Sequence, residues 1–194
     1  ELYGDTEQET AILPSEYKQV EYIESSGTQY IDTGIQPSDD IGIYQKFTKN
    51  NTEDEEVLGT GGITGTNDRF YGLTMFNENV AFGWNEYYRL LEDGNYVIGI
   101  NYNNIAQLGI GELAEAWINY ENSRKVRYKN AARNYDIKTG NLPTLNSTNR
   151  NILIFGYKNT TSIVPCSCRI YRLIFTRGTS EIMDFIPCYR ISDN

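Results

Sequence analysis

The chain has 194 residues, of which 39% are hydrophobic, and this is enough for one domain that buries about 70% of its unfolded surface. No apolar run approaches the roughly 18 residues that a membrane-spanning helix needs, so we expect a soluble globular protein. The formal net charge of -9 disfavours nucleic acid as a partner, and the count of 0 His excludes Ser-His-Asp and Cys-His catalysis and His-ligated zinc.

Short runs rich in Ile, Val, Tyr, Phe and Thr recur between clusters of Gly, Asn, Asp and Pro, which is typical of an all-β sandwich. Residues 1–13 are acidic and weakly patterned, so we interpret them as an arm or linker before a domain at 14–194. The predicted strands cover residues 19–23, 29–35, 41–48, 56–60, 70–76, 80–84, 96–102, 151–157, 166–177 and 181–190. This number of strands predicts an antiparallel jelly-roll sandwich of two sheets.

Alternating residues predict which face of each strand is buried. In 41–48, Ile41, Ile43 and Phe47 share one face, and Tyr44 and Lys46 share the other. In 166–177 the predicted core face carries Cys166, Cys168, Ile170 and Ile174, and the predicted outer face, where a partner would dock, carries Arg169, Tyr171, Leu173, Phe175 and Arg177.

The interval 107–133 gives no clear periodicity. Residues 112–117 include good helix formers, so a short helix and a non-helical structure both stay open there. Residues 131–150 turn to Asn, Thr, Gly and Pro with few core residues, and we expect a long ordered loop.

The three cysteines are Cys166, Cys168 and Cys188. They are too few and too clustered for a disulfide framework, so we interpret them as buried thiols. A disulfide from Cys188 to one of the other two stays open, because it would require adjacent strands.

Two runs at the ends of the domain carry a family resemblance. LPSEYKQVEYIESSGTQYIDTGI covers residues 13–35, and RIYRLIFTRGTSEIMDFIPCYRISDN covers residues 169–194. Both resemble the terminal strands of LamG-like, concanavalin A-like jelly-roll domains of bacteriophage virion proteins and bacterial surface proteins. The resemblance implies that fold and a virion or cell-surface location. Within these runs, Gly27 suits a positive φ, and Pro187 suits an edge strand or a bulge.

Catalysis by paired carboxylates is the remaining enzymatic option, because some jelly-roll relatives are glycoside hydrolases. The acidic run at residues 53–56 has the composition of a solvated hairpin tip. Glu181 and Asp184 have an odd spacing, which on a regular strand places them on opposite faces. We therefore predict a protein that is not an enzyme.

Calcium is the metal to consider, since it binds oxygen ligands from Asp, Asn and backbone carbonyls. The candidate ligands are Asp39 and Asp40 at one turn, and Asn67 and Asp68 at another. A purely turn-forming role is the favoured interpretation, and we predict no cofactor.

Sugar rings stack on exposed aromatic rings, and their hydroxyls bind planar polar groups. One candidate sugar-binding group consists of Trp84, Asn85, Tyr87 and Tyr88. Another candidate group contains Trp117 and Tyr120. The alternative is that these aromatic residues only pack the sheets.

The favoured hypothesis is a β-sandwich module of a phage virion or bacterial surface that mediates adhesion by contacting cell-surface glycans or other surface proteins. The alternative is a structural virion or filament subunit that forms homo-oligomers and binds no small ligand. The acidic arm supports this alternative, because residues 112–194 are rich in basic residues and would offer a complementary surface.

Overall fold

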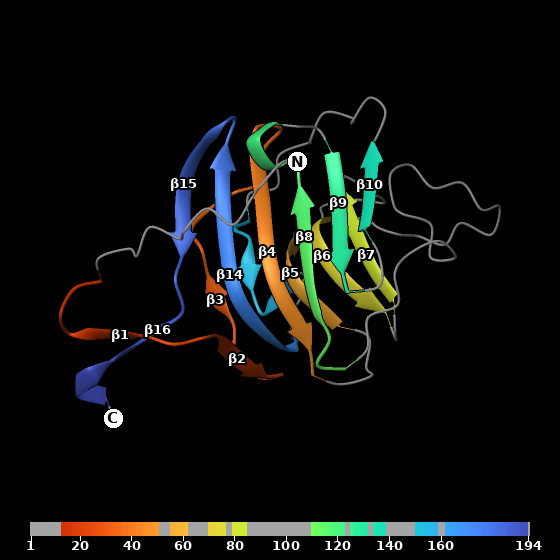
Figure 1. The fold of residues 1–194 in the computed structure, drawn as a ribbon. Helices are drawn as coiled ribbons and strands as arrows, with labels where there is room; N and C mark the ends of the chain where they lie inside the picture. The colour runs from red at the N-terminus through yellow and green to blue at the C-terminus, as the bar shows by residue number, and fades with distance from the viewer. Residues whose placement is uncertain are drawn as a thin grey trace.

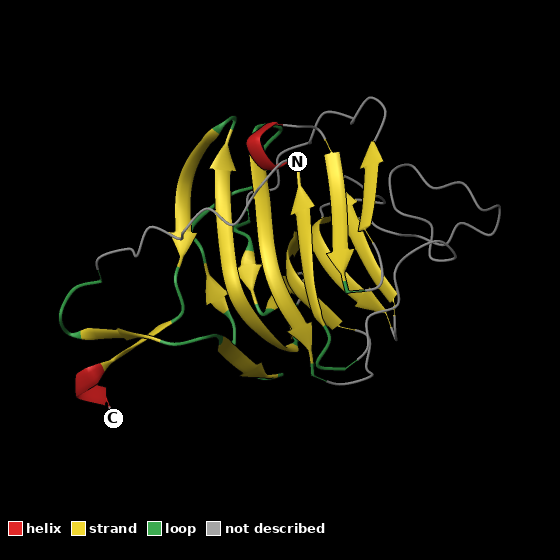
Figure 2. Ribbon diagram, in the orientation of Figure 1, coloured by secondary structure: helices red, strands yellow, loops and turns green. Residues whose placement is uncertain are grey.

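The computed structural model describes residues 13–50, 55–61, 70–76, 79–84, 110–122, 125–131, 134–138, 150–158 and 162–193. They form two packed β-sheets and a separate two-stranded ribbon (Figure 1). The helical parts of this region are two 3-10 turns, η2 (Tyr120–Asn122) and η3 (Ile191–Asp193) (Figure 2). None of the described helical segments is long and apolar enough to span a membrane.

Sheet I provides the face on which the candidate site lies. Its strands, in spatial order, are β10 (Asn134–Lys138), β9 (Lys125–Asn130), β8 (Leu113–Ile118), β4 (Ile41–Lys49), β14 (Ser167–Arg177) and β15 (Ser180–Phe185). β2 (Ile23–Ser26) pairs with the first part of β14, along the edge that β15 occupies further on. β14 therefore has a neighbouring strand on both sides over most of its length.

Sheet II packs behind sheet I in the view of Figure 1. Its strands are β13 (Ile163–Pro165), β12 (Gly156–Lys158), β5 (Glu55–Gly61), β11 (Leu153–Ile154) and β3 (Ile31–Asp32), with β6 (Phe70–Phe76) and β7 (Asn79–Trp84) added beyond β5. The ribbon consists of β1 (Tyr17–Gln19) and β16 (Cys188–Arg190), which pair antiparallel beside the sandwich.

The core lies between the two sheets, and the pattern in β4 is the one predicted. Ile41, Ile43 and Phe47 are buried on its core face, whereas Tyr44 and Lys46 are half-buried on the outer face. The buried hydrophobic residues are Ile35, Ile41, Ile43, Phe47, Ala114, Ala116, Ile118, Ile152, Leu153, Ile154, Phe155, Cys166, Cys168, Ile170, Leu173, Ile174 and Phe175.

The prediction for 166–177 is partly wrong because β14 contains a bulge. The register with β4 shifts between Ile170 and Arg172, so the alternation of faces reverses beyond this point. Leu173 and Phe175, which we predicted to face outward, are fully buried in the core. Ile174 instead lies in line with Tyr44 on the outer face.

In the middle of the chain the structure decides one open alternative and corrects one prediction. Residues 113–118 form β8 and not a helix, since Ala114, Ala116 and Ile118 alternate toward the core and this burial outweighs helix propensity. The predicted loop at 131–150 contains β10, which pairs with β9.

At the chain ends the strand boundaries differ from those predicted. The expected strand at 19–23 divides between β1 and β2, and the one at 181–190 divides between β15 and β16. Pro187 lies in the second break, where its carbonyl accepts a hydrogen bond from the Val20 amide at 2.9 Å. Gly27 has φ 93°, as predicted. The expected strand at 96–102 lies outside the described residues.

The cysteines are free thiols. Cys166 and Cys168 are buried in the core, with their sulfur atoms 3.4 Å apart. Cys188 is half-buried in the ribbon. The prediction of buried thiols is thus confirmed for the first two, and no disulfide joins Cys188 to either of them.

Candidate functional site

Strand pairing places a row of side chains across the outer face of sheet I, which is turned away from sheet II. Tyr44 on β4 lies opposite Trp117 on β8 and opposite Ile174 on β14. Trp117 in turn lies opposite Arg127 on β9, and Ile174 lies opposite Asp184 on β15. Because Cβ atoms of residues paired in this way are about 5 Å apart, the row is continuous across the face, and within it Ile174 is buried whereas Tyr44, Trp117 and Arg127 are half-buried.

Three aromatic rings gather on this row, and we call Tyr44, Trp117 and Tyr120 the aromatic patch. The ring centroids of Tyr44 and Trp117 are 5.2 Å apart, and those of Tyr44 and Tyr120 are 6.0 Å apart. Both pairs are tilted, with interplanar angles of 47° and 51°, within the favourable range for aromatic pairs. All three side chains are half-buried, so the rings fix one another while part of each stays open to solvent.

Charged groups border the aromatic patch. The Arg172 Nη2 donates a hydrogen bond to Asp184 Oδ2 at 3.0 Å, and this bond raises the pKa of Arg172. The Tyr120 hydroxyl donates to Glu181 Oε1 at 3.0 Å. The border therefore presents planar donors and acceptors next to the rings.

The structure corrects the prediction that Glu181 and Asp184 lie on opposite faces. The register between β14 and β15 shifts between Phe175 and Thr176, so that Glu181 pairs with Thr176 while Asp184 pairs with Ile174. This bulge brings both carboxylates to the outer face. There Glu181 accepts a hydrogen bond from Tyr120, and Asp184 accepts one from Arg172.

Tyr44 is held neutral by its surroundings. Burial raises the pKa of its hydroxyl, and the adjacent Glu115 carboxylate adds to the effect. The neutral hydroxyl is therefore kept as a hydrogen-bond donor.

The raised pKa of Tyr44 predicts a loss of stability at high pH. Unfolded chains release this proton near pH 10, whereas the folded protein retains it, so the free energy of unfolding should fall as pH rises above about 10. Urea unfolding between pH 8 and pH 11 would measure this, compared with Tyr44→Phe. An equal decline in both proteins would contradict the assignment to Tyr44.

A strained turn positions Tyr120. Asn119, Glu121 and Asn122 have positive φ values of 47°, 54° and 54°, which non-glycine residues rarely adopt. The buried Asn119 Nδ2 donates to the Asp39 and Ile41 carbonyls, each at 3.0 Å. These bonds tie the turn to the start of β4 and fix the backbone from which Tyr120 reaches the patch.

Replacing Asn119 by alanine should reduce the free energy of unfolding by about 2–4 kcal/mol. The substitution leaves both carbonyls without this donor, and alanine tolerates positive φ less well than asparagine does. Thermal or urea unfolding would measure the loss. Asn122→Ala, at an exposed position with similar φ, isolates the cost of the backbone conformation alone.

The structure unites only part of the predicted binding residues. Trp117 and Tyr120 lie together in the aromatic patch. Trp84 ends β7 in sheet II, and the predicted contacts Asn85, Tyr87 and Tyr88 lie outside the described residues.

The sequence reasoning missed Tyr44 and Arg172 as site residues. The alternation in 41–48 already placed Tyr44 on the polar face, and this signal could have identified it. No comparable signal existed for Arg172, because the bulge in β14 decides which way it faces.

The described residues contain no group of three or more His, Cys, Asp or Glu side chains suited to a metal ion. The Asp40 carboxylate accepts a hydrogen bond from the Ser38 hydroxyl and forms an ion pair with Arg177 at 3.7 Å. The backbone carbonyl of Asp40 accepts a hydrogen bond from the Gly178 amide. Asp39 contributes a carbonyl to Asn119. Both candidates thus have structural contacts at this turn, and Asn67 and Asp68 lie outside the described residues.

Comparison with known proteins reveals similarity in structure. No family model matches this sequence, and no curated protein matches it. The CBM40 of a Ruminococcus gnavus IT-sialidase, solved with α2,3-sialyllactose bound, matches with a TM-score of 0.58 at 14% identity, over 82% of this chain and 91% of that chain. Domains LG4-5 of the mouse laminin α1 chain match with a TM-score of 0.50 at 15% identity, over 84% of this chain and 44% of that chain.

These matches agree with the arrangement of the described strands in two sheets. The described strands form two packed sheets with mainly antiparallel pairing. The chain therefore has the jelly-roll sandwich fold of LamG-like, concanavalin A-like domains.

Proposed function

We propose that this chain is a non-catalytic module that binds carbohydrate on the outer face of sheet I. The observation that carries the proposal is the aromatic patch, in which Tyr44, Trp117 and Tyr120 are half-buried on the outer sheet face with charged groups at its border. The apolar faces of sugar rings stack on such rings. The Arg172–Asp184 pair and Glu181 offer charged partners for the sugar hydroxyls at the patch border.

Similarity of fold supports the proposal. The matched CBM40 has α2,3-sialyllactose bound, so an acidic glycan belongs among the ligands to test. In this chain, Arg127 and Arg172 are the cationic side chains at the patch, and they would bind the acidic group of such a ligand. The carboxylates Glu181 and Asp184 are engaged by Tyr120 and Arg172, which suits a role in binding and in fixing the rings.

A glycan array printed with neutral and sialylated glycans tests the proposal. We expect the fluorescently labelled chain to bind a subset of glycans, and isothermal titration with the strongest of these to give a saturable affinity. Absence of signal on every glycan would contradict carbohydrate binding.

We further propose adhesion on a phage virion or bacterial surface as the biological setting, on the strength of the terminal motifs. Labelled protein should bind bacterial cells, and periodate oxidation of the cell-surface glycans should remove that binding. Binding that survives periodate would point to a protein receptor.

A self-assembling structural subunit is the second candidate, favoured by the ribbon. β1 and β16 pair only with each other in the described chain, and Tyr17 in β1 and Ile191 directly after β16 are exposed. Light scattering on the full chain and on residues 14–194 separates the candidates. A defined oligomer that is lost with residues 1–13 would favour the subunit, and monomers in both cases would exclude it.

A further inference from the structure

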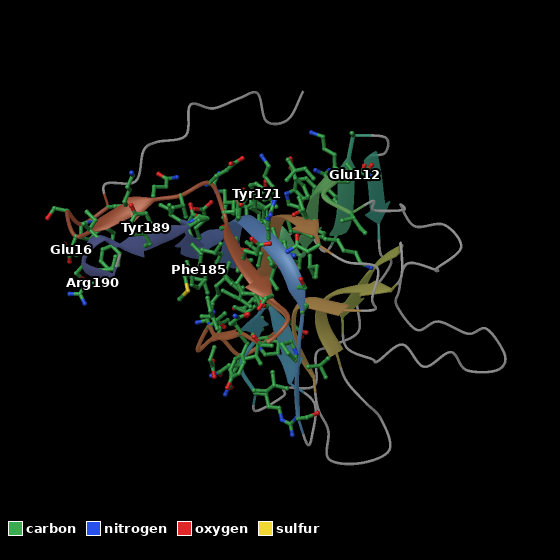
Figure 3. The ribbon with its side chains drawn as sticks, turned by 90° about the horizontal axis from the view of Figure 1, so that it is seen from below. Glu16, Glu112, Tyr171, Phe185, Tyr189 and Arg190 are labelled. Atoms are coloured by element: carbon green, nitrogen blue, oxygen red, sulfur yellow. The ribbon has the colours of Figure 1, made fainter. Side chains whose placement is uncertain are left out.

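A second cluster of aromatic and charged side chains lies on the same outer face, beside the first part of β14. It consists of Tyr22, Glu24, Asn50, Arg169 and Tyr171, and we call it the second cluster. Arg169 on β14 lies opposite Glu24 on β2. Figure 3 shows Tyr171 on the side of β14 away from sheet II.

The contacts within the second cluster hold its groups in fixed positions. The Arg169 guanidinium lies 4.6 Å above the centroid of the Tyr22 ring, and its Nε is 3.2 Å from Glu24 Oε1. The Tyr22 and Tyr171 rings are 5.4 Å apart with a tilt of 56°. The Asn50 Nδ2 donates to Glu24 Oε1 at 2.9 Å. A guanidinium held by a ring and a carboxylate loses little freedom on binding a ligand.

These groups remain accessible. The Arg169 and Glu24 side chains are 38% and 42% exposed, and both tyrosines are half-buried. An exposed ion pair contributes little to stability, so replacing one member should leave the fold intact. The guanidinium, carboxylate and amide can each form two hydrogen bonds with adjacent sugar hydroxyls, and the rings offer stacking surfaces.

The bulge in β14 connects the second cluster with the aromatic patch. The register with β4 shifts at Tyr171, so that Tyr171 and the next residue, Arg172, both belong to the outer face. Tyr171 contacts Tyr22 of the second cluster, and Arg172 pairs with Asp184 at the patch border. From Arg169 to Ile174 the strand extends roughly 15 Å, which exceeds the length of one sugar ring.

We propose that the second cluster is a further subsite for the same ligand, so that the chain recognises an oligosaccharide that extends along β14 and not a single terminal sugar. This inference rests on the proposed carbohydrate binding. The aromatic patch then supplies the first contact, and Tyr22, Arg169 and Tyr171 contact the more distant sugars.

A glycan array with graded series from monosaccharides to hexasaccharides, on neutral and on sialylated backbones, tests the inference. For wild type we expect stronger binding of the longer members. Tyr22→Leu, which keeps apolar bulk without the ring, and Arg169→Lys, which keeps the charge without the planar fork, should lower binding of the longer members about five- to tenfold. Binding of the shortest bound members should stay unchanged, and this also verifies the fold of each variant.

The outcomes separate the two proposals. If the long glycans bind both variants as tightly as wild type, or if chain length has no effect on wild type, the second subsite is wrong while carbohydrate binding stands. If wild type binds no glycan of any length, the proposed function itself fails, and the second subsite fails with it. Equal losses for short and long glycans in both variants would also overturn an extended subsite.

Discussion

Replacing Trp117 by alanine is expected to weaken glycan binding about 10- to 100-fold, with little change in stability. Trp117 contributes the largest ring of the aromatic patch, and its ring lies 5.2 Å from that of Tyr44. Large aromatic side chains near the centre of a binding surface typically carry a dominant share of the binding energy. Since the side chain is half-buried, its removal should leave no large cavity in the core. Isothermal titration with the strongest glycan from the array would measure the effect.

Two companion variants make this test specific. Trp117→Phe retains a smaller ring and should restore part of the affinity. Tyr30→Ala removes an aromatic residue that is 48% exposed and lies next to β3 in sheet II, so its affinity should equal that of wild type. If Trp117→Ala bound as tightly as wild type, the aromatic patch would not be the binding site.

Replacing Gly42 by valine is expected to reduce the free energy of unfolding by about 2–4 kcal/mol and also to abolish binding. A Cβ atom at this position would lie 2.4 Å from the Asn119 carbonyl oxygen and 2.5 Å from Thr176 Oγ1, both closer than real contacts allow. The backbone of the strained turn would therefore have to move away from β4, and Tyr120 would move with it. Thermal unfolding should show a melting temperature lower by about 5 to 15 °C.

Gly34→Ala provides a matched control for Gly42. A Cβ atom at Gly34 meets no atom within 4 Å, but the residue has φ +71°. This variant should lose only about 1 kcal/mol, from backbone strain, and should retain full binding. Wild-type stability and binding in Gly42→Val would show that the close approach of the turn is not needed for the site.

The features that sequence predicted well depend on strict alternation along a strand. In β4, Ile41, Ile43 and Phe47 lie at alternate positions and occupy the core face, and this also places Tyr44 outside. The end motifs predicted the jelly-roll fold, since they cover strands from both sheets and the ribbon.

The features that sequence missed depend on breaks in that alternation. One bulge in β14 turned Leu173 inward and Arg172 outward, and another between β14 and β15 brought Glu181 to the face of Asp184. A bulge depends on pairing with a partner strand, and this leaves no periodic mark in the sequence itself. The turn around Asn119 could not be predicted from sequence either, because it approaches β4 closely only where Gly42, in a distant part of the chain, has no side chain.

The central position of β14 constrains when this protein can acquire its binding face. β14 (Ser167–Arg177) pairs along its length with β4 (Ile41–Lys49), which the ribosome makes much earlier. Tyr44 and Trp117 are thus present on a nascent chain before the strand that completes their sheet has been synthesised. Such distant pairing makes folding slow, on the order of milliseconds to seconds. The face should therefore mature after translation of β14, and a chain interrupted before that strand should present the aromatic residues to chaperones and not to a glycan.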